Sequence, residues 1–143
     1  MNTDSPPATI LVIDDHIALA QGFAQALTIA GYTVLVAHDA SSALDQAHRH
    51  HPDGIILDFQ MPFVNGSGFL YRLRSSAALR DTPVLVVTGQ SLTSEVGMEL
   101  RELDANVLHK PISMADLVAR TRSLLAVRNA RASGGGNAIG RIG

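Results

Sequence analysis

The sequence predicts an α/β domain built on a five-stranded parallel sheet. Five short apolar runs, rich in β-branched residues, are typical of buried strands. The segments between these runs place apolar residues at helical spacing, so predicted strands and helices alternate along the chain. With 143 residues, 46% of them hydrophobic, the chain is long enough to bury a core as one domain.

The first half of the chain contains three of these strands. They span residues 9–13, 33–37 and 54–58. A helix over Ile17–Ala30 separates the first two strands, and Gly31 is a suitable C-terminal stop for it. Asp39 can cap a second helix that runs to about Arg49. A polar, proline-containing lead at residues 1–7 precedes these elements.

The second half continues the alternation. The predicted elements are a helix at 66–75, a strand opened by Pro83 and ending at Thr88, a helix at 92–103 and a strand at 105–109. Gly97 lies inside the helix at 92–103 and weakens its helical propensity by about 1 kcal/mol relative to alanine. Ser113 can cap a fifth helix, so the domain is expected to cover residues 8–127. Residues 128–143 have too few apolar side chains to fold alone and are expected to form a tail or linker.

Composition excludes several classes of function. A net charge of -2 gives no electrostatic case for membrane or nucleic-acid binding, and the chain has no cysteine for disulfides or thiolate metal sites. No apolar stretch approaches the roughly 20 residues of a membrane helix, and the N-terminus lacks the pattern of a signal peptide. We therefore expect a cytoplasmic protein. The run His48-Arg49-His50-His51 is interpreted as the cationic end of a helix rather than a metal site.

Polar residues follow four of the five apolar runs. They are Asp14, Asp15, Asp58, Thr88 and Lys110. Because the carboxyl ends of parallel strands share one edge, where open sheets bind ligands, these side chains are expected to converge. Carboxylates about 4 Å apart repel by about 4 kcal/mol at an effective dielectric near 20, so the group requires a cation. Oxygen ligands favour Mg²⁺, and an aspartate beside it can act as a phosphoryl acceptor.

The chain resembles the receiver domain of the two-component response regulators. The resemblance rests on Asp14-Asp15 after the first strand, Asp58 in Leu-Asp-Phe-Gln-Met-Pro, Thr88-Gly89 and Lys110-Pro111. It implies a flavodoxin-like three-layer fold with strand order 2-1-3-4-5. It also implies that Asp58 is phosphorylated, and that Thr88 and Lys110 bind the phosphoryl group. The implied Mg²⁺ ligands are Asp15, Asp58 and the backbone carbonyl of Gln60, with Asp14 acting mostly through water.

The resemblance also implies the partners. The donor would be a phosphohistidine on a sensor histidine kinase or a histidine phosphotransfer protein, and the Lys-Pro bond would be cis. The expected docking residues lie on the first helix and after the fifth strand, and they are Ile17, Ala18, Gln21, Pro111 and Ile112. The downstream target is a protein that the sequence does not identify, and a homodimer stays open. Such a domain transfers phosphoryl groups only to and from its own aspartate, so it is not an enzyme that turns over a substrate.

Two departures from the family pattern leave an alternative open. Val107 stands three residues before the lysine, where most members have Tyr or Phe, and Glu102-Leu103 replaces a usual Ala-Gly pair. These departures keep a phosphorylation-independent interaction module in consideration. A Mg²⁺-dependent phosphohydrolase of the haloacid dehalogenase type needs a second acid two residues after the nucleophile, where this chain has Gln60.

Overall fold

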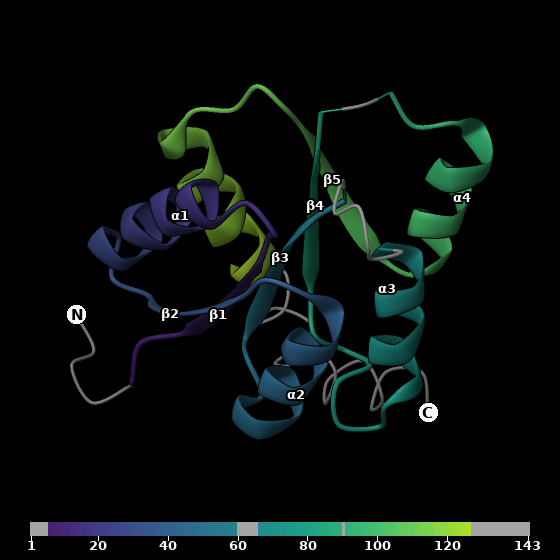
Figure 1. Cartoon of the computed structure of the whole chain (residues 1–143), viewed down its shortest axis with the longest axis horizontal. Helices are drawn as coiled ribbons and strands as arrows, with labels where there is room; N and C mark the ends of the chain where they lie inside the picture. The colour runs from purple at the N-terminus through teal and green to yellow at the C-terminus, as the bar shows by residue number, and fades with distance from the viewer. Residues whose placement is uncertain (1–5, 60–65, 90, 127–143) are drawn as a thin grey trace, which may run out of the picture.

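The computed structural model describes residues 6–59, 66–89 and 91–126, and these form a five-stranded sheet covered by helices (Figure 1). The strands pair in the order β2-β1-β3-β4-β5, as the family resemblance implies, and all four pairings are parallel, as the alternation of strands and helices predicts. The elements are β1 (Thr9–Ile13), α1 (Ile17–Ile29), β2 (Thr33–Ala37), α2 (Ala40–His50), β3 (Gly54–Asp58), α3 (Gly66–Ser75), β4 (Val84–Thr88), α4 (Ser94–Glu102) and β5 (Ala105–His109). A last helix occupies residues 114–126. Gln60, the proline loop after β3 and the tail at 128–143 lie outside the described residues.

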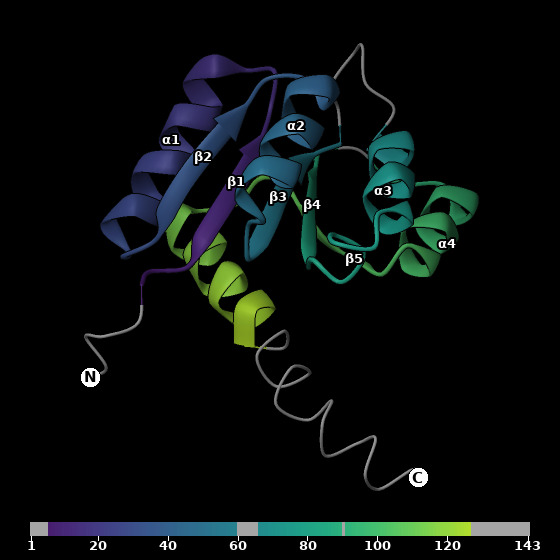
Figure 2. The ribbon, with the colours of Figure 1, turned by 90° about the horizontal axis from the view of Figure 1, so that it is seen from below.

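The helices cover both faces of the sheet (Figure 2). Helix α1 and the last helix lie on one face, and α2, α3 and α4 lie on the other. The side chains of β1 point alternately to the two faces of the sheet, because successive residues of a strand point to opposite faces. Ile10 and Val12 pack with Phe23 of α1, whereas Leu11 and Ile13 pack with Leu70 of α3. A sheet buried on both faces needs continuous apolar strands, which explains the uninterrupted runs in the sequence.

Local capping fixes most of the helix ends that the sequence predicts. The Asp39 carboxylate accepts the Ser42 N–H at 2.7 Å, and the Ser113 hydroxyl accepts the Asp116 N–H at 3.0 Å. Gly31 has φ 106°, a left-handed conformation that glycine adopts without strain. Helix α4 is shorter than predicted, because the Thr93 hydroxyl accepts the Val96 N–H at 3.2 Å and starts the helix there.

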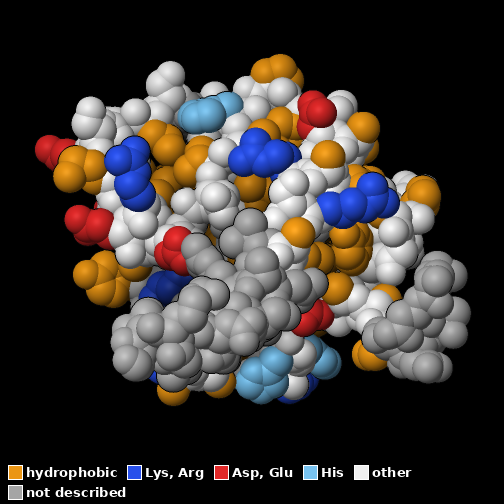
Figure 3. All heavy atoms as spheres, turned by 180° about the vertical axis from the view of Figure 1, so that it is seen from behind, with side chains coloured by type: hydrophobic (Ala, Val, Ile, Leu, Met, Phe, Trp, Pro, Cys, Tyr) orange, Lys and Arg blue, Asp and Glu red, His pale blue; other side chains and the backbone are white. Residues whose placement is uncertain are grey.

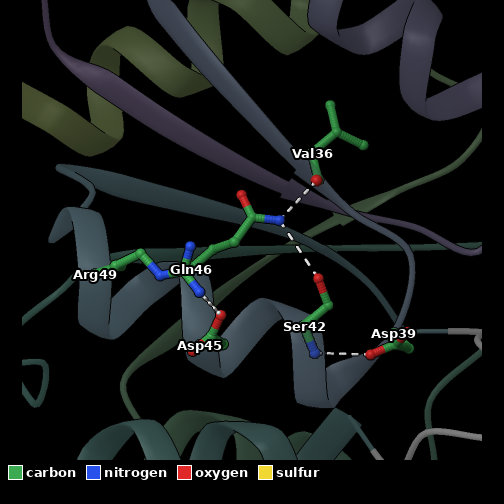
Figure 4. A network of polar contacts seen from close by, with 6 residues as sticks. All are labelled: Val36, Asp39, Ser42, Asp45, Gln46 and Arg49. Carbon is green, nitrogen blue, oxygen red and sulfur yellow. Dashed lines mark hydrogen bonds and ion pairs between the residues drawn. The ribbon is translucent and has the colours of Figure 1, made fainter.

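Helix α2 is attached to the edge strand β2 by a side-chain bridge (Figure 4). The Gln46 amide donates to the Val36 carbonyl at 2.9 Å and lies 3.4 Å from the Ser42 hydroxyl. An edge strand has a row of backbone groups that no neighbouring strand can pair, so a side chain that satisfies one of them also protects the edge. The Arg49–Asp45 pair at 2.6 Å is solvent-exposed and contributes little to stability.

Charged side chains do not form a continuous basic surface on the face shown in Figure 3. Lys and Arg side chains stand apart there, with hydrophobic and acidic side chains between them. This distribution agrees with the net charge of -2, and the described residues of that face form no electrostatic footprint for a polyanion. Among the described residues, no helix has both the length and the apolar character that crossing a bilayer requires.

Arg74 joins three segments at the end of the sheet opposite the strands' carboxyl ends. Its guanidinium donates to the Leu103 carbonyl at 2.8 Å, to the Arg80 carbonyl at 3.0 Å and to the Thr82 carbonyl at 2.5 Å. Leu103 ends α4, while Arg80 and Thr82 belong to the connection from α3 to β4. One side chain of α3 therefore fixes both the entry to β4 and the entry to β5.

Replacing Arg74 with alanine is expected to lower the free energy of unfolding by about 2 kcal/mol, because four carbonyls lose the hydrogen bonds that they accept from a charged donor. Urea unfolding followed by circular dichroism measures the change. Arg72→Ala is the matched control, since Arg72 lies on the same helix and is exposed. Equal stability of the two variants would show that the guanidinium contacts carry no net stabilisation.

Candidate functional site

The strand order reverses between β1 and β3, and the candidate site lies beyond the carboxyl ends of these two strands. Asp58 is the last residue of β3 and is 5% exposed, and Asp14 directly follows β1 and is fully buried. Ligand atoms of Asp14, Asp15, His16 and Asp58 all lie within 4.8 Å of one another. The predicted convergence of the three aspartates is therefore present. We call Asp14, Asp15 and Asp58 the carboxylate pocket.

The backbone of Asp14 is held from the neighbouring edge strand. Its N–H donates to the Ala37 carbonyl at 3.0 Å, and its own carbonyl oxygen lies 2.9 Å from Nδ1 of His38. Because a carbonyl oxygen can only accept, this His38 nitrogen must carry the proton. The sequence pattern gave no role to the residues after β2. Applying the strand-end rule to that strand as well would have indicated His38.

The surroundings of Asp14 disfavour its charged form. Burial raises the pKa of Asp14 to about 6, the hydrogen bond from the His16 N–H acts against this rise, and the nearby Asp58 carboxylate raises the pKa further. The positive charge of Lys110 lowers it. Oδ1 of Asp14 accepts the His16 N–H at 2.9 Å, whereas Oδ2 is buried with no hydrogen-bond partner among the described residues. A buried acceptor without a partner is costly, and a bound cation, a water molecule or a proton on the carboxyl would each satisfy it.

The donor set fits a hard divalent ion. Asp15 is partly exposed, so the pocket is open on the side of that carboxylate, while Asp14 and Asp58 form its buried floor. Mg²⁺ takes oxygen ligands from one or two carboxylates and retains several waters, which suits a pocket of this kind. The predicted third ligand, the Gln60 carbonyl, lies outside the described residues.

The ammonium group of Lys110, the residue that follows β5, lies beside the pocket. The Lys110 ammonium lies 3.7 Å from Oδ1 of Asp58, and the backbone N–H of Lys110 donates to the Thr88 carbonyl at 2.7 Å. Thr88 is the last residue of β4 and is fully buried. The Lys110-Pro111 bond is cis, as the family resemblance implies. The ends of β1, β3, β4 and β5 thus all supply residues to one edge of the sheet.

An apolar cleft adjoins Lys110 on the α1 side of the sheet. Its volume is about 450 Å³, and its walls are Leu19, Phe23, Gly89, Lys110, Pro111, Ile112 and Met114. Pro111 and Ile112, two of the expected docking residues, line the cleft. Ile17, at the start of α1, is 58% exposed, and Ala18 and Gln21 are also exposed. The surface predicted for a partner is therefore accessible.

The run from His48 to His51 does not form a metal site with other described residues. His48, Arg49 and His50 occupy the last turn of α2, and His51 is its left-handed C-cap with φ 46°. Cationic side chains in this position complement the negative end of the helix dipole. The helix-end interpretation of this run agrees with its placement.

The fold and the site together define an α/β domain with an acidic, cation-requiring pocket at the carboxyl edge of its sheet. The family model for the response regulator receiver domain matches residues 10–122. The chain belongs to this family. It is a receiver domain of two-component signalling, and no finding favours an interaction module without phosphorylation.

Known relatives agree with this assignment. The response regulator MprA of Mycobacterium avium (strain 104) is 38% identical over 119 residues, which is 81% of this chain and 50% of that protein. The chain thus spans about half the length of the curated relatives it matches. The chemotaxis protein CheY4 of Vibrio cholerae has a TM-score of 0.77 at 30% identity, covering 82% of this chain and 98% of that chain. A CheY-like receiver domain protein from Methanospirillum hungatei, at 21% identity, has the same fold, with a TM-score of 0.80, and covers 87% of this chain and 98% of that chain.

The raised pKa of Asp14 predicts that a neutral isostere stabilises the metal-free protein. Folding favours the protonated carboxyl, so the penalty is absent below the ordinary aspartate pKa of 3.8, grows between pH 3.8 and about 6, and is complete at higher pH. Asp14→Asn should therefore raise the free energy of unfolding at about pH 7.5 by on the order of 2 kcal/mol, and much less at about pH 4.5.

Urea unfolding in the presence of a chelator tests this prediction. Asp81→Asn serves as the control, because Asp81 is exposed and should show no such difference between the two pH values. An Asp14→Asn protein that is less stable than wild type at neutral pH would mean that the hydrogen bonds of the carboxylate outweigh its burial.

Proposed function

We propose that Asp58 is the phosphoacceptor of this receiver domain. The observation that carries the proposal is the position of Asp58 between a buried carboxylate at the end of β1 and the Lys110 ammonium, 3.7 Å from its Oδ1. A carboxylate that faces both a cation-requiring group and a fixed ammonium can approach an anionic phosphoryl group without prohibitive repulsion. The proposed Mg²⁺ ligands are Asp15, Asp58 and the Gln60 carbonyl, with Asp14 acting through water.

The proposed reaction is a transfer between two nucleophiles. A carboxylate oxygen of Asp58 forms a bond to phosphorus as the phosphorus–nitrogen bond of a phosphohistidine breaks, and the departing imidazole takes a proton. Mg²⁺ supplies charge neutralisation for the phosphoryl oxygens. Lys110 adds a point charge and Thr88 a hydroxyl donor. Water later attacks phosphorus and returns the Asp58 carboxylate and inorganic phosphate, so the domain resets itself without turning over another substrate.

The proposed donor is a sensor histidine kinase or a histidine phosphotransfer protein in the cytoplasm. The apolar cleft supports this, because it borders Lys110 and so brings a docked surface close to Asp58. Phosphorylation would draw Thr88 and Lys110 toward the new anion and alter the packing of α4 and β5. Val107 is half-buried against the core on the α4 side, so a change there can reach α4 without an aromatic switch.

Incubation with Mg²⁺ and acetyl phosphate should add one phosphoryl group to the wild-type chain, detected by intact-protein mass spectrometry. Asp58→Asn should remove the adduct completely, because no other carboxylate of the described residues has the same neighbours. Asp81→Asn is the control and should be phosphorylated normally, since Asp81 is exposed and distant in sequence from the pocket residues. A folded wild-type protein that acquires no phosphate, or an Asp58→Asn variant that still does, would contradict the proposal.

Substitution of two exposed isoleucines at opposite ends of α1 tests where the kinase docks. Ile17, 58% exposed, lies at the end of α1 near the pocket, and Ile29, 79% exposed, lies at the other end. Ile17→Asp should slow phosphotransfer from a kinase that phosphorylates the wild-type chain by about tenfold, because a central apolar contact contributes more than about 1 kcal/mol. Ile29→Asp should have little effect.

Phosphorylation by acetyl phosphate separates docking from chemistry. Both isoleucine variants should react with this small donor at the wild-type rate, because neither residue belongs to the carboxylate pocket. Equal loss of kinase-dependent transfer in Ile17→Asp and Ile29→Asp would place the docking surface elsewhere.

A further inference from the structure

His16 has no part in the function proposed above, yet it lies at the mouth of the carboxylate pocket. A ring nitrogen of His16 is within 4.8 Å of ligand atoms of all three aspartates, and Nδ1 is 3.6 Å from Oδ1 of Asp15. The His16 side chain is 79% exposed, whereas Asp14 and Asp58 form the buried floor. The imidazole therefore stands where a bound ion would meet solvent.

Helix stability does not explain a histidine at this position. His16 is the N-cap residue of α1, but its side chain makes no capping hydrogen bond. Ser, Thr, Asp and Asn are the residues that stabilise a helix N-terminus, and a positive charge there opposes the helix dipole. What is fixed is the backbone, because the His16 N–H donates to Oδ1 of Asp14 at 2.9 Å. This hydrogen bond holds the His16 backbone beside the pocket.

A second observation points independently to a bound cation. Oδ2 of Asp14 is buried and has no hydrogen-bond partner among the described residues. Asp14 is also a member of the group whose ligand atoms lie within 4.8 Å of one another. The pocket therefore holds an acceptor that a bound cation would satisfy, and His16 is the one nitrogen ligand in that group.

Adding an imidazole to the three carboxylates changes which metal ion the group prefers. Mg²⁺ prefers oxygen, whereas imidazole suits Zn²⁺ and neighbouring transition metals. Two ligands of one tetrahedral Zn²⁺ ion, each at about 2.0–2.2 Å, are about 3.4 Å apart. The ligand atoms of the four residues lie within 4.8 Å of one another, so the group could hold one metal ion after its side chains draw closer. Three carboxylates and one imidazole complete a tetrahedral site, which leaves no position for another ligand.

We propose that His16 makes the phosphorylation pocket a Zn²⁺ site in which Asp14, Asp15, Asp58 and His16 enclose the ion and exclude Mg²⁺. Zn²⁺ and Mg²⁺ compete for the same carboxylates, and only the Mg²⁺ form leaves the Asp58 side open to a phosphoryl group. This consequence for signalling rests on the proposed function of Asp58, whereas the binding of Zn²⁺ through His16 does not.

Calorimetric titration of the unphosphorylated full chain with Zn²⁺ alone, and separately with Mg²⁺ alone, tests the proposal. His16→Ala should weaken Zn²⁺ binding at the pocket by about tenfold or more and leave Mg²⁺ affinity within about twofold. His50→Ala is the matched control, because His50 is an exposed histidine in the last turn of α2, outside the pocket. It should change neither affinity. Asp58→Asn should weaken both.

The outcomes separate the inference from the proposed function. Equal Zn²⁺ affinity in wild type and His16→Ala, or loss of Zn²⁺ binding in His50→Ala alone, would overturn the inference. If Asp58 accepts phosphate in Mg²⁺ while His16→Ala has no effect on Zn²⁺ binding, only the inference fails. If His16→Ala weakens Zn²⁺ binding but Asp58 never accepts phosphate, only the proposed function fails. When both hold, Zn²⁺ should inhibit phosphorylation by acetyl phosphate, and added Mg²⁺ should relieve the inhibition.

Discussion

The repulsion between buried carboxylates at the ends of β1 and β3 is the constraint on which the site depends. Asp14 is fully buried and Asp58 nearly so, and burial together with the nearby Asp58 carboxylate raises the pKa of Asp14. The chain relieves this only in part, through the Lys110 ammonium and the His16 N–H. The rest must come from a proton or a metal ion. The close carboxylates therefore suit the pocket to a divalent cation, and receiver domains bind Mg²⁺ at such an acidic pocket.

The carboxylates can remain close only because the scaffold prevents them from moving apart. Four strands meet at this edge in a parallel sheet buried on both faces, so the ends of β1 and β3 cannot separate without breaking the core. The edge strand adds a local restraint, since Ala37 and His38 hold both backbone groups of Asp14. Burial of the aliphatic strands thereby supplies the free energy that holds like charges together.

The sequence predicts the fold well because its signals are local. All five predicted strands end where the structure ends them, and Asp39, Gly31 and Ser113 act at the helix ends as expected. The convergence of the aspartates and Lys110 also follows from strand ends alone. Arg74 and His38 were missed because their partners are backbone carbonyl oxygens, one of them 29 residues from Arg74 and the other 24 residues from His38. Every residue has such an oxygen, so no pattern of residue types marks the one that is bound, although the position of His38 after a strand could have drawn attention to it.

The start of α1 links metal choice to partner docking. His16 stands at the mouth of the carboxylate pocket, and Ile17, the next residue, begins the surface proposed for the phosphohistidine partner. A partner seated on Ile17 and the cleft beside Lys110 would also cover the imidazole. Exchange of one divalent ion for another requires access from solvent, and the exposed ring lies on that route. The ion that will accompany phosphotransfer must therefore be in place before the partner docks, so the free domain is the state in which metal competition acts.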